Sequence, residues 1–136
     1  MLKIYTLATL FILILFCSCA SQTNRQLIMG SWEIIPAGRI LEMQQTAASL
    51  GLPVSKVVLT FKSDNTMKSE TMHDNKVSAT NTGSYSFDEN EKNLIIYREG
   101  KKDRKNTAGI LELTNSRMIL VDISGSGDTM KLKKLK

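Results

Sequence analysis

The most reactive side chains in this chain are two cysteines, and both lie near its start. Cys17 and Cys19 are separated by one serine, and no cysteine follows them. A cysteine thiolate can serve as a nucleophile, a metal ligand or one half of a disulfide. Because the body of the chain has no thiol, we expect none of these roles there. An exported form would depend on its hydrophobic core without disulfides.

Other residues that could do chemistry are few. His73 is the only histidine and lies beside Asp74. Nucleophilic catalysis needs a nucleophile and an orienting group around such a base, and a metal site built on two histidines is excluded. The acidic run Asp88–Glu91 lacks the alternating oxygen ligands and central glycine of a Ca²⁺ loop and is interpreted as a solvated turn. We therefore expect no catalytic residue, no metal, no cofactor and no enzymatic activity.

The segment before Cys19 has the organisation of a secretory signal. Lys3 precedes an apolar run that ends at the small residues around Ser18. The apolar stretch from Ile4 to Phe16 has 13 residues, whereas a transmembrane helix needs about 20. We therefore predict that residues 1–18 form an N-terminal signal helix that is cleaved, and the length disfavours the alternative of a retained membrane anchor.

The end of this segment resembles the lipobox of bacterial lipoproteins, with Ser18 as the small residue before Cys19. The resemblance implies that Cys19 is acylated and becomes the first residue of the mature protein. Phe16 departs from the aliphatic residue usual in the family, and Cys17 is the alternative acylation site. Several acyl chains would hold the protein stably on a membrane. In some bacterial groups, acidic residues just after the acylated cysteine resemble a signal for export to the cell surface. No acidic residue directly follows Cys19, which favours the periplasmic face of the outer membrane.

The rest of the chain alternates between apolar and polar residues, which is typical of half-buried strands. Residues 19–26 are polar and aperiodic and are predicted to be a lipidated, flexible tether. Residues 27–136 are predicted to form one all-β domain. Its eight expected strands are 31–35, 56–62, 66–72, 76–87, 93–98, 107–113, 117–123 and 129–135. Short turns between them favour antiparallel neighbours closed into a barrel or folded into a sandwich.

One segment has helical rather than alternating spacing. Ile40, Met43, Ala47 and Leu50 fall on one face of a helix over residues 38–50, and Gly51 stands where a helix commonly ends. Two interpretations are open. The helix either covers one end of the barrel as part of its core, or it acts as a lid over a ligand cavity.

The order of three motifs resembles small lipocalin-like lipoproteins common in Bacteroidota. These are Gly30-Ser31-Trp32, the hairpin Leu59–Thr66 and the strand Gly83–Phe87. The resemblance covers residues 27–135 and implies an eight-stranded antiparallel lipocalin-like β-barrel. It also implies that Gly30 and Trp32 close the barrel base under a basic side chain of the last strand, where three lysines are present: Lys131, Lys133 and Lys134.

A barrel of eight strands is either filled by its side chains or holds one small ligand. Most expected inward residues are bulky: Ile34, Val57, Leu59, Phe61, Met67, Tyr85, Phe87, Leu94, Ile96, Leu111, Leu113, Leu120 and Leu132. Small inward residues, which would leave space for a cavity, occur on one strand only: Ala79, Asn81 and Gly83. The predicted ligand pocket comprises these three with Phe61 and Tyr85.

Two functions remain open from the sequence. The first is non-enzymatic binding of a small hydrophobic or amphipathic ligand. The second is a structural or adaptor lipoprotein with a filled barrel that docks on a larger envelope assembly. The formal net charge is +5, and the basic run over residues 98–105 could meet anionic lipids or glycans. Nucleic acid is not an expected partner of an exported lipoprotein.

Overall fold

A computed structural model describes residues 21–53, 55–100 and 104–136. The predicted signal helix, Cys19 and part of the basic run lie outside these residues. Eight antiparallel strands form a closed barrel in simple sequential order, with β8 pairing back onto β1. This confirms the predicted barrel rather than a sandwich. The strands are β1 (Gly30–Ile35), β2 (Ser55–Phe61), β3 (Thr66–His73), β4 (Lys76–Phe87), β5 (Asn93–Arg98), β6 (Lys105–Leu113), β7 (Arg117–Asp122) and β8 (Thr129–Lys134).

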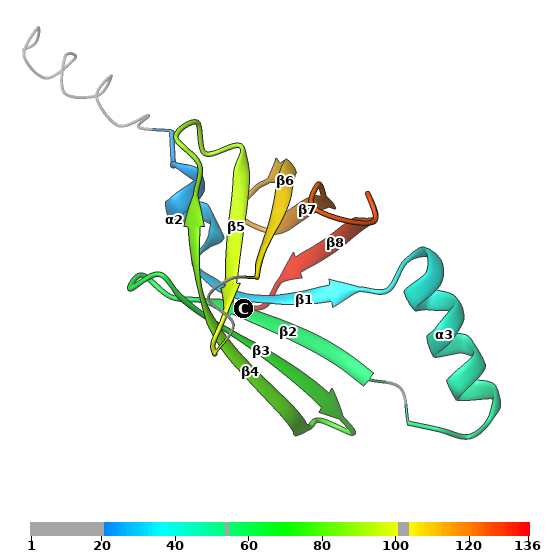
Figure 1. The fold of residues 1–136 in the computed structure, drawn as a ribbon. Coiled ribbons are helices and arrows are strands. Elements are labelled where there is room, and N and C mark those ends of the chain that lie inside the picture. Colours follow the sequence, from blue (N-terminus) through cyan, green and yellow to red (C-terminus); the bar gives the residue numbers. More distant parts are fainter. Residues whose placement is uncertain (1–20, 54, 101–103) are drawn as a thin grey trace, which may run out of the picture.

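Two helices lie at opposite ends of the barrel (Figure 1). The short helix α2 (Asn24–Ile28) precedes β1, and α3 (Gly38–Ser49) connects β1 to β2. In Figure 1, β1 begins near α2 and runs toward α3, which stands beyond the ends of β1 and β2. We call the end at α2 the base and the end at α3 the mouth.

The hydrophobic core fills the half of the barrel nearest the base. Its fully buried side chains are Ile28, Trp32, Phe61, Leu94, Met118 and Leu132. Ile28 is the last residue of α2. Alternation puts the other five on the inner face of their strands, as the period-two pattern predicts. Because the ring is closed and this core lies between Ile28 and Leu132, residues 21–136 contain a complete barrel with its own core.

The strand Arg117–Asp122 is apolar on both faces, and the register decides which set faces inward. Met118 and Leu120 are buried, opposite Leu132 and Met130 of β8. Ile119 and Val121 therefore lie on the outer face. Ile123, just beyond β7, is also exposed.

The expectation that Leu111 faces inward is wrong, because a β-bulge interrupts strand β6. Ile110 pairs with Leu120, and Glu112 pairs with Ile119, so Leu111 is the extra residue between them. A bulge shifts the alternation of side chains by one position. Ile110 and Leu113 therefore pack against the core, whereas Leu111 is 63% exposed.

Candidate functional site

The mouth half of the barrel contains a cavity of about 420 Å³. This volume falls within the range of small-molecule sites, about 300–1,000 Å³. Its lining comes from all eight strands and comprises Ile34, Val57, Leu59, Met67, Ser69, Asn81, Thr82, Gly83, Ile96, Tyr97, Arg98, Asn106, Thr107, Ala108, Leu120, Asp122, Asp128 and Met130. The barrel is thus filled at its base and hollow toward its mouth.

The cavity is apolar at its floor and polar along one side of its rim. The floor residues Leu59, Met67 and Leu120 also belong to the buried core. Across β3 to β6, the pairs Ser69↔Asn81, Gly83↔Arg98 and Ile96↔Asn106 put polar side chains on the inner face near the mouth. On β1 and β2 the lining is apolar instead. This arrangement suits a molecule with an apolar part and a polar head.

The structure brings only part of the predicted pocket together. Asn81 and Gly83 line the cavity. Ala79 does not, and it is exposed, because the outer end of the β3–β4 hairpin lies beyond the cavity lining. Phe61 and Tyr85 do not line it either, since they pack edge-to-face in the base core with ring centroids 5.1 Å apart.

Tyr85 is a core residue with a satisfied hydroxyl. Its hydroxyl group donates a hydrogen bond to the backbone carbonyl of Lys62 at 2.7 Å. Burial raises the pKa of this phenol. The bond to Lys62 and the core packing give Tyr85 a role in holding β4 against the β2–β3 turn.

Gly83 allows two backbones to approach closely. A Cβ atom at this position would lie 2.2 Å from the carbonyl oxygen of Tyr97, which no side chain can tolerate without movement. The missing side chain is therefore needed for β4 to pair with β5. The sequence pattern predicted Gly83 at the cavity, but as a source of space for a ligand.

Several polar residues of the cavity rim were absent from the predicted pocket, among them Arg98 and Asn106. Arg98 also borders a more open groove on the outer face of β3, β4 and β5, so it stands at the lip between the inner and outer surfaces. The alternation of β5 starting from Leu94 would have assigned Arg98 to the inner face. In the sequence, however, Arg98 also begins the basic run over residues 98–105, which hides this position.

Carboxylates occupy the opposite side of the rim, but one of them is already engaged. The Asp122 carboxylate accepts backbone N–H groups of Ser124 and Ser126, each at 3.0 Å. These bonds, with that of Ser126 the largest cause, hold the pKa of Asp122 below its ordinary value. Asp122 therefore organises the β7–β8 turn, and Asp128 is the more exposed acid at this side.

The barrel base is closed by Trp32, as the resemblance implied. Trp32 is fully buried, and its indole N–H donates to the carbonyl of Ile28 at 2.7 Å. The basic partner is Lys134, whose ammonium lies 5.1 Å from the centre of the indole ring. Gly30 has a φ of +116°, and a Cβ there would lie 3.0 Å from the Lys134 side chain. Gly30 therefore accommodates both the backbone turn and the lysine.

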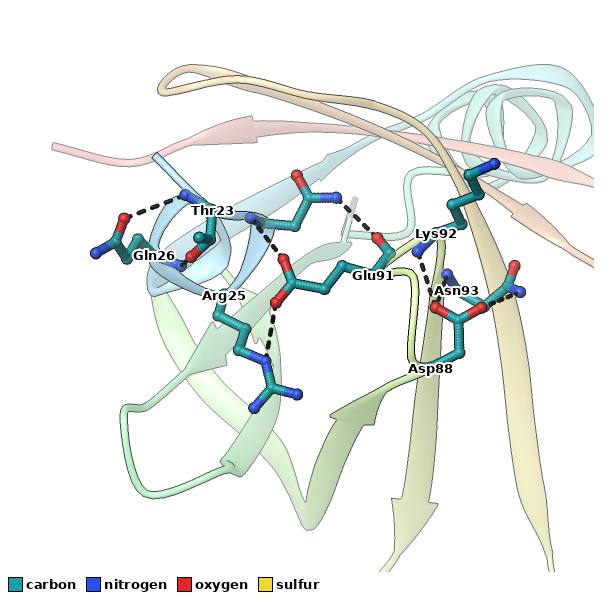
Figure 2. A network of polar contacts seen from close by, with 8 residues as sticks. Thr23, Arg25, Gln26, Asp88, Glu91, Lys92 and Asn93 are labelled. Carbon is teal, nitrogen blue, oxygen red and sulfur yellow. Dashed lines mark hydrogen bonds and ion pairs between the residues drawn. The ribbon is translucent and has the colours of Figure 1, made fainter. Parts of the chain in front are cut away.

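The prediction of a flexible tether through residue 26 is wrong for its last residues. Asn24–Ile28 form helix α2, which begins with a capping box between Thr23 and Gln26. The Glu91 carboxylate accepts the Asn24 backbone N–H at 3.1 Å and the Arg25 side chain at 3.0 Å. Figure 2 shows Glu91 reaching from the β4–β5 turn to Arg25. The polar residues at 23–26 therefore cap and fasten a helix.

The turn that holds Glu91 is itself braced by Asp88. Its carboxylate accepts the backbone N–H groups of Lys92 at 2.8 Å and Asn93 at 3.0 Å (Figure 2). The Asn93 bond is the largest cause that holds the pKa of Asp88 below its ordinary value. The interpretation of this acidic run as a merely solvated turn is thus incomplete, because it fastens α2 to the barrel.

Helix α3 ends where predicted, with Gly51 at a φ of +70°, but it does not cover the barrel as part of the core. None of its residues is buried, and none lines the cavity. Its side-chain link to the barrel is a bond of 2.9 Å from the Gln44 amide to the Ser55 carbonyl. Apolar residues of α3 and the following loop are exposed: Ile40, Leu41, Met43, Leu50 and Leu52.

The remaining candidates for chemistry stay apart from the cavity. His73 ends β3, with its Nδ1 atom 3.4 Å from the Ser55 hydroxyl. Among the residues that the structure describes, no three His, Cys, Asp or Glu side chains are grouped so that they could hold a metal ion. No helix within the described ranges is long and apolar enough to cross a membrane.

Comparison with known proteins agrees with this geometry. A family model described as a lipocalin-like domain matches residues 28–120, which is more than half of the chain. The chain belongs to the lipocalin-like domain family. The matched range of this lipocalin-like domain begins at Ile28, at the plugged base, and ends at Leu120, on the cavity floor. No curated protein and no solved structure was found to match the chain.

Proposed function

We propose that this lipocalin-like protein binds a small hydrophobic or amphipathic ligand in its barrel, without catalysis. The observation that carries the proposal is the cavity of about 420 Å³ above an apolar floor. Burial of apolar ligand surface there would supply most of the affinity, at about 25 cal/mol per Å², and the rim residues would orient the polar part.

Native mass spectrometry tests the binding role. Residues 21–136 would be produced without the leader, incubated with a lipid extract of the cell envelope and measured against the untreated protein. We expect an added mass of one small molecule. An unchanged mass would count against a ligand-binding role.

We further propose that the protein is an envelope lipoprotein, with residues 1–18 removed and Cys19 acylated. The helix cap Thr23 is only the fourth residue after Cys19, and a chain of that length spans at most about 14 Å. An acylated Cys19 would therefore keep the base close to the membrane and leave the mouth pointing away from it. This orientation fits the periplasmic face of the outer membrane, where the mouth is open to soluble ligands.

Metabolic labelling with a fatty-acid analogue tests the anchor. The wild type should incorporate the label, and Cys19→Ser should not. Cys17→Ser is the matched control, because it removes the neighbouring thiol and should leave labelling intact. Label that persists in Cys19→Ser would refute acylation at this position.

The alternative function is an adaptor that docks on a larger envelope assembly. The observation that favours it is the exposed apolar side chains on α3, among them Met43 at 67%. Exposed apolar groups that gather on one element often mark interaction sites. Co-purification of a stoichiometric protein partner that is lost in Met43→Ser would favour this role over ligand binding.

A further inference from the structure

The rim of the cavity has one cationic side, and this asymmetry indicates the chemistry of the ligand's head. Arg98 is the last residue of β5 and pairs with Gly83, a residue of the cavity wall. The four ion pairs found between described residues do not include Arg98. Its guanidinium can therefore offer donors to a ligand.

Amide side chains flank this arginine on the inner face. Asn81 lies two residues closer to the mouth than Gly83 on β4, and Asn106 faces Ile96 across β5 and β6. All three polar residues line the same cavity. A guanidinium with amide neighbours can donate several hydrogen bonds to the oxygens of a carboxylate or a phosphate.

The other side of the rim disfavours an anion. Asp122 and Asp128 both line the cavity there, and the Asp122 carboxylate is held ionised by bonds within its own turn. An anionic head would be repelled from β7 and β8 and attracted to β5. The floor below Arg98 is apolar, with Ile96 and Leu120 among its residues.

We propose that the cavity takes a single-chain amphiphile with an anionic head, which Arg98 binds while the apolar floor holds the chain. A free fatty acid and a lysophospholipid share this chemistry. The inference rests on the proposed ligand-binding function and adds the charge of the head. It also assigns Arg98 as a residue that determines specificity.

Calorimetric titration of residues 21–136 tests this assignment. The probes are dodecanoate, dodecanol and dodecyltrimethylammonium at pH 7.4, each below its micellar concentration. We expect dodecanoate to bind most tightly, and Arg98→Gln to weaken it about five- to tenfold without changing dodecanol. Charge-assisted hydrogen bonds of about 1–1.5 kcal/mol correspond to such a change. Added salt should weaken the binding of dodecanoate and leave that of the neutral dodecanol unchanged.

The matched control is Lys105→Gln. Lys105 begins β6 at the same end of the barrel but pairs with Tyr97, so it lies on the outer face. The Lys105→Gln substitution removes the same charge without touching the cavity and should leave dodecanoate binding unchanged. Thermal unfolding would confirm that both variants fold. Titration with a lauroyl lysophosphatidylglycerol then distinguishes the two sources of an anionic head, and tight binding of either supports the proposal.

The outcomes separate this inference from the proposed function. If dodecanol binds as tightly as dodecanoate, and Arg98→Gln changes neither, ligand binding stands and the role of Arg98 is refuted. Preferred binding of the cationic probe would also refute it. If none of the probes binds, the inference and the ligand-binding function fail together.

Discussion

Lys134 lies over Trp32 at the base of the barrel, with its ammonium 5.1 Å from the centre of the indole ring. The same ammonium donates a hydrogen bond of 3.0 Å to the carbonyl of Leu27. One lysine of the last strand thus joins the first strand to helix α2. The core that stabilises the barrel is gathered at the closed base. The opposite end can therefore remain hollow.

Trp32→Ala should lower the free energy of unfolding by about 3–5 kcal/mol, as truncation of other large core side chains does. The indole is fully buried and its N–H is bonded to Ile28, so the change leaves both a cavity and an unpaired carbonyl. Urea unfolding measures the effect. A loss below about 1 kcal/mol would contradict a buried Trp32.

Lys134→Met should lower the stability by about 1–2 kcal/mol. The variant keeps the aliphatic stem but loses the cation–π contact, which contributes about 0.5–2 kcal/mol, and the hydrogen bond to Leu27. Lys133→Met is the control, because Lys133 is more exposed and its ion pair with Glu33 is long, at 3.7 Å. Equal melting temperatures of the two variants would argue against a special role of Lys134.

Glu91→Ala should loosen helix α2 and lower the stability by about 1 kcal/mol. The carboxylate of Glu91 is only 27% exposed and holds both Asn24 and Arg25, and charged hydrogen bonds are stronger than neutral ones. Hydrogen exchange of the amides of α2 should accelerate. Glu89→Ala changes the same turn at an exposed position and should leave this exchange as in the wild type.

Gly83→Ala should destabilise the barrel by about 1–3 kcal/mol, as overpacking typically does. The added Cβ would meet the backbone oxygen of Tyr97 at 2.2 Å, and a backbone oxygen cannot move aside cheaply. Gly109→Ala is a matched comparison, because its Cβ would meet the Val121 side chain at 3.1 Å. Chemical denaturation should rank Gly83→Ala as the more harmful, and the reverse order would contradict this account.

The stability contributed by Asp88 should fade in acid. Its pKa is depressed in the folded protein, whereas an unfolded aspartate titrates near 3.9. Its contribution is therefore present above that pH and is lost as the pH falls through the lower folded pKa. Asp88→Ala should have a lower melting temperature than the wild type at pH 7, and the difference should narrow below about pH 4. A difference that stays constant down to pH 2 would contradict the assignment.

Local patterns were enough to predict the strands and their antiparallel order, whereas their closure into a barrel was implied by the resemblance to the lipocalin-like family. The alternation in Lys76–Phe87 predicts strand β4, of which Tyr85 is buried in the core, and the Asp64-Asn65 turn sets the β2–β3 hairpin, where Asn65 has a φ of 64°. Both signals operate between neighbours in sequence, so they can be read without knowing the fold. Gly30 and Trp32 were found in the same way, from a motif at the start of the first strand.

The remaining features depend on which strands become neighbours. The bulge at Leu111 arises only when β6 meets β7. The same reason explains why Lys134, among three lysines, reaches Trp32 and Leu27. Helix α2 is fastened to the barrel because Glu91, distant in sequence, lies close enough to bind it.

The cavity shows the same division most clearly. By itself, the sequence determined eight antiparallel strands and small residues along β4, because alternation and turn chemistry are local. The resemblance of its motifs to a known family added the closed barrel with a tryptophan at its base. Only the tertiary structure decided that the base is filled, that the mouth is hollow and that Arg98 stands at the lip. Those facts depend on the register of every strand pair in the closed barrel, and these pairs involve residues along the whole chain.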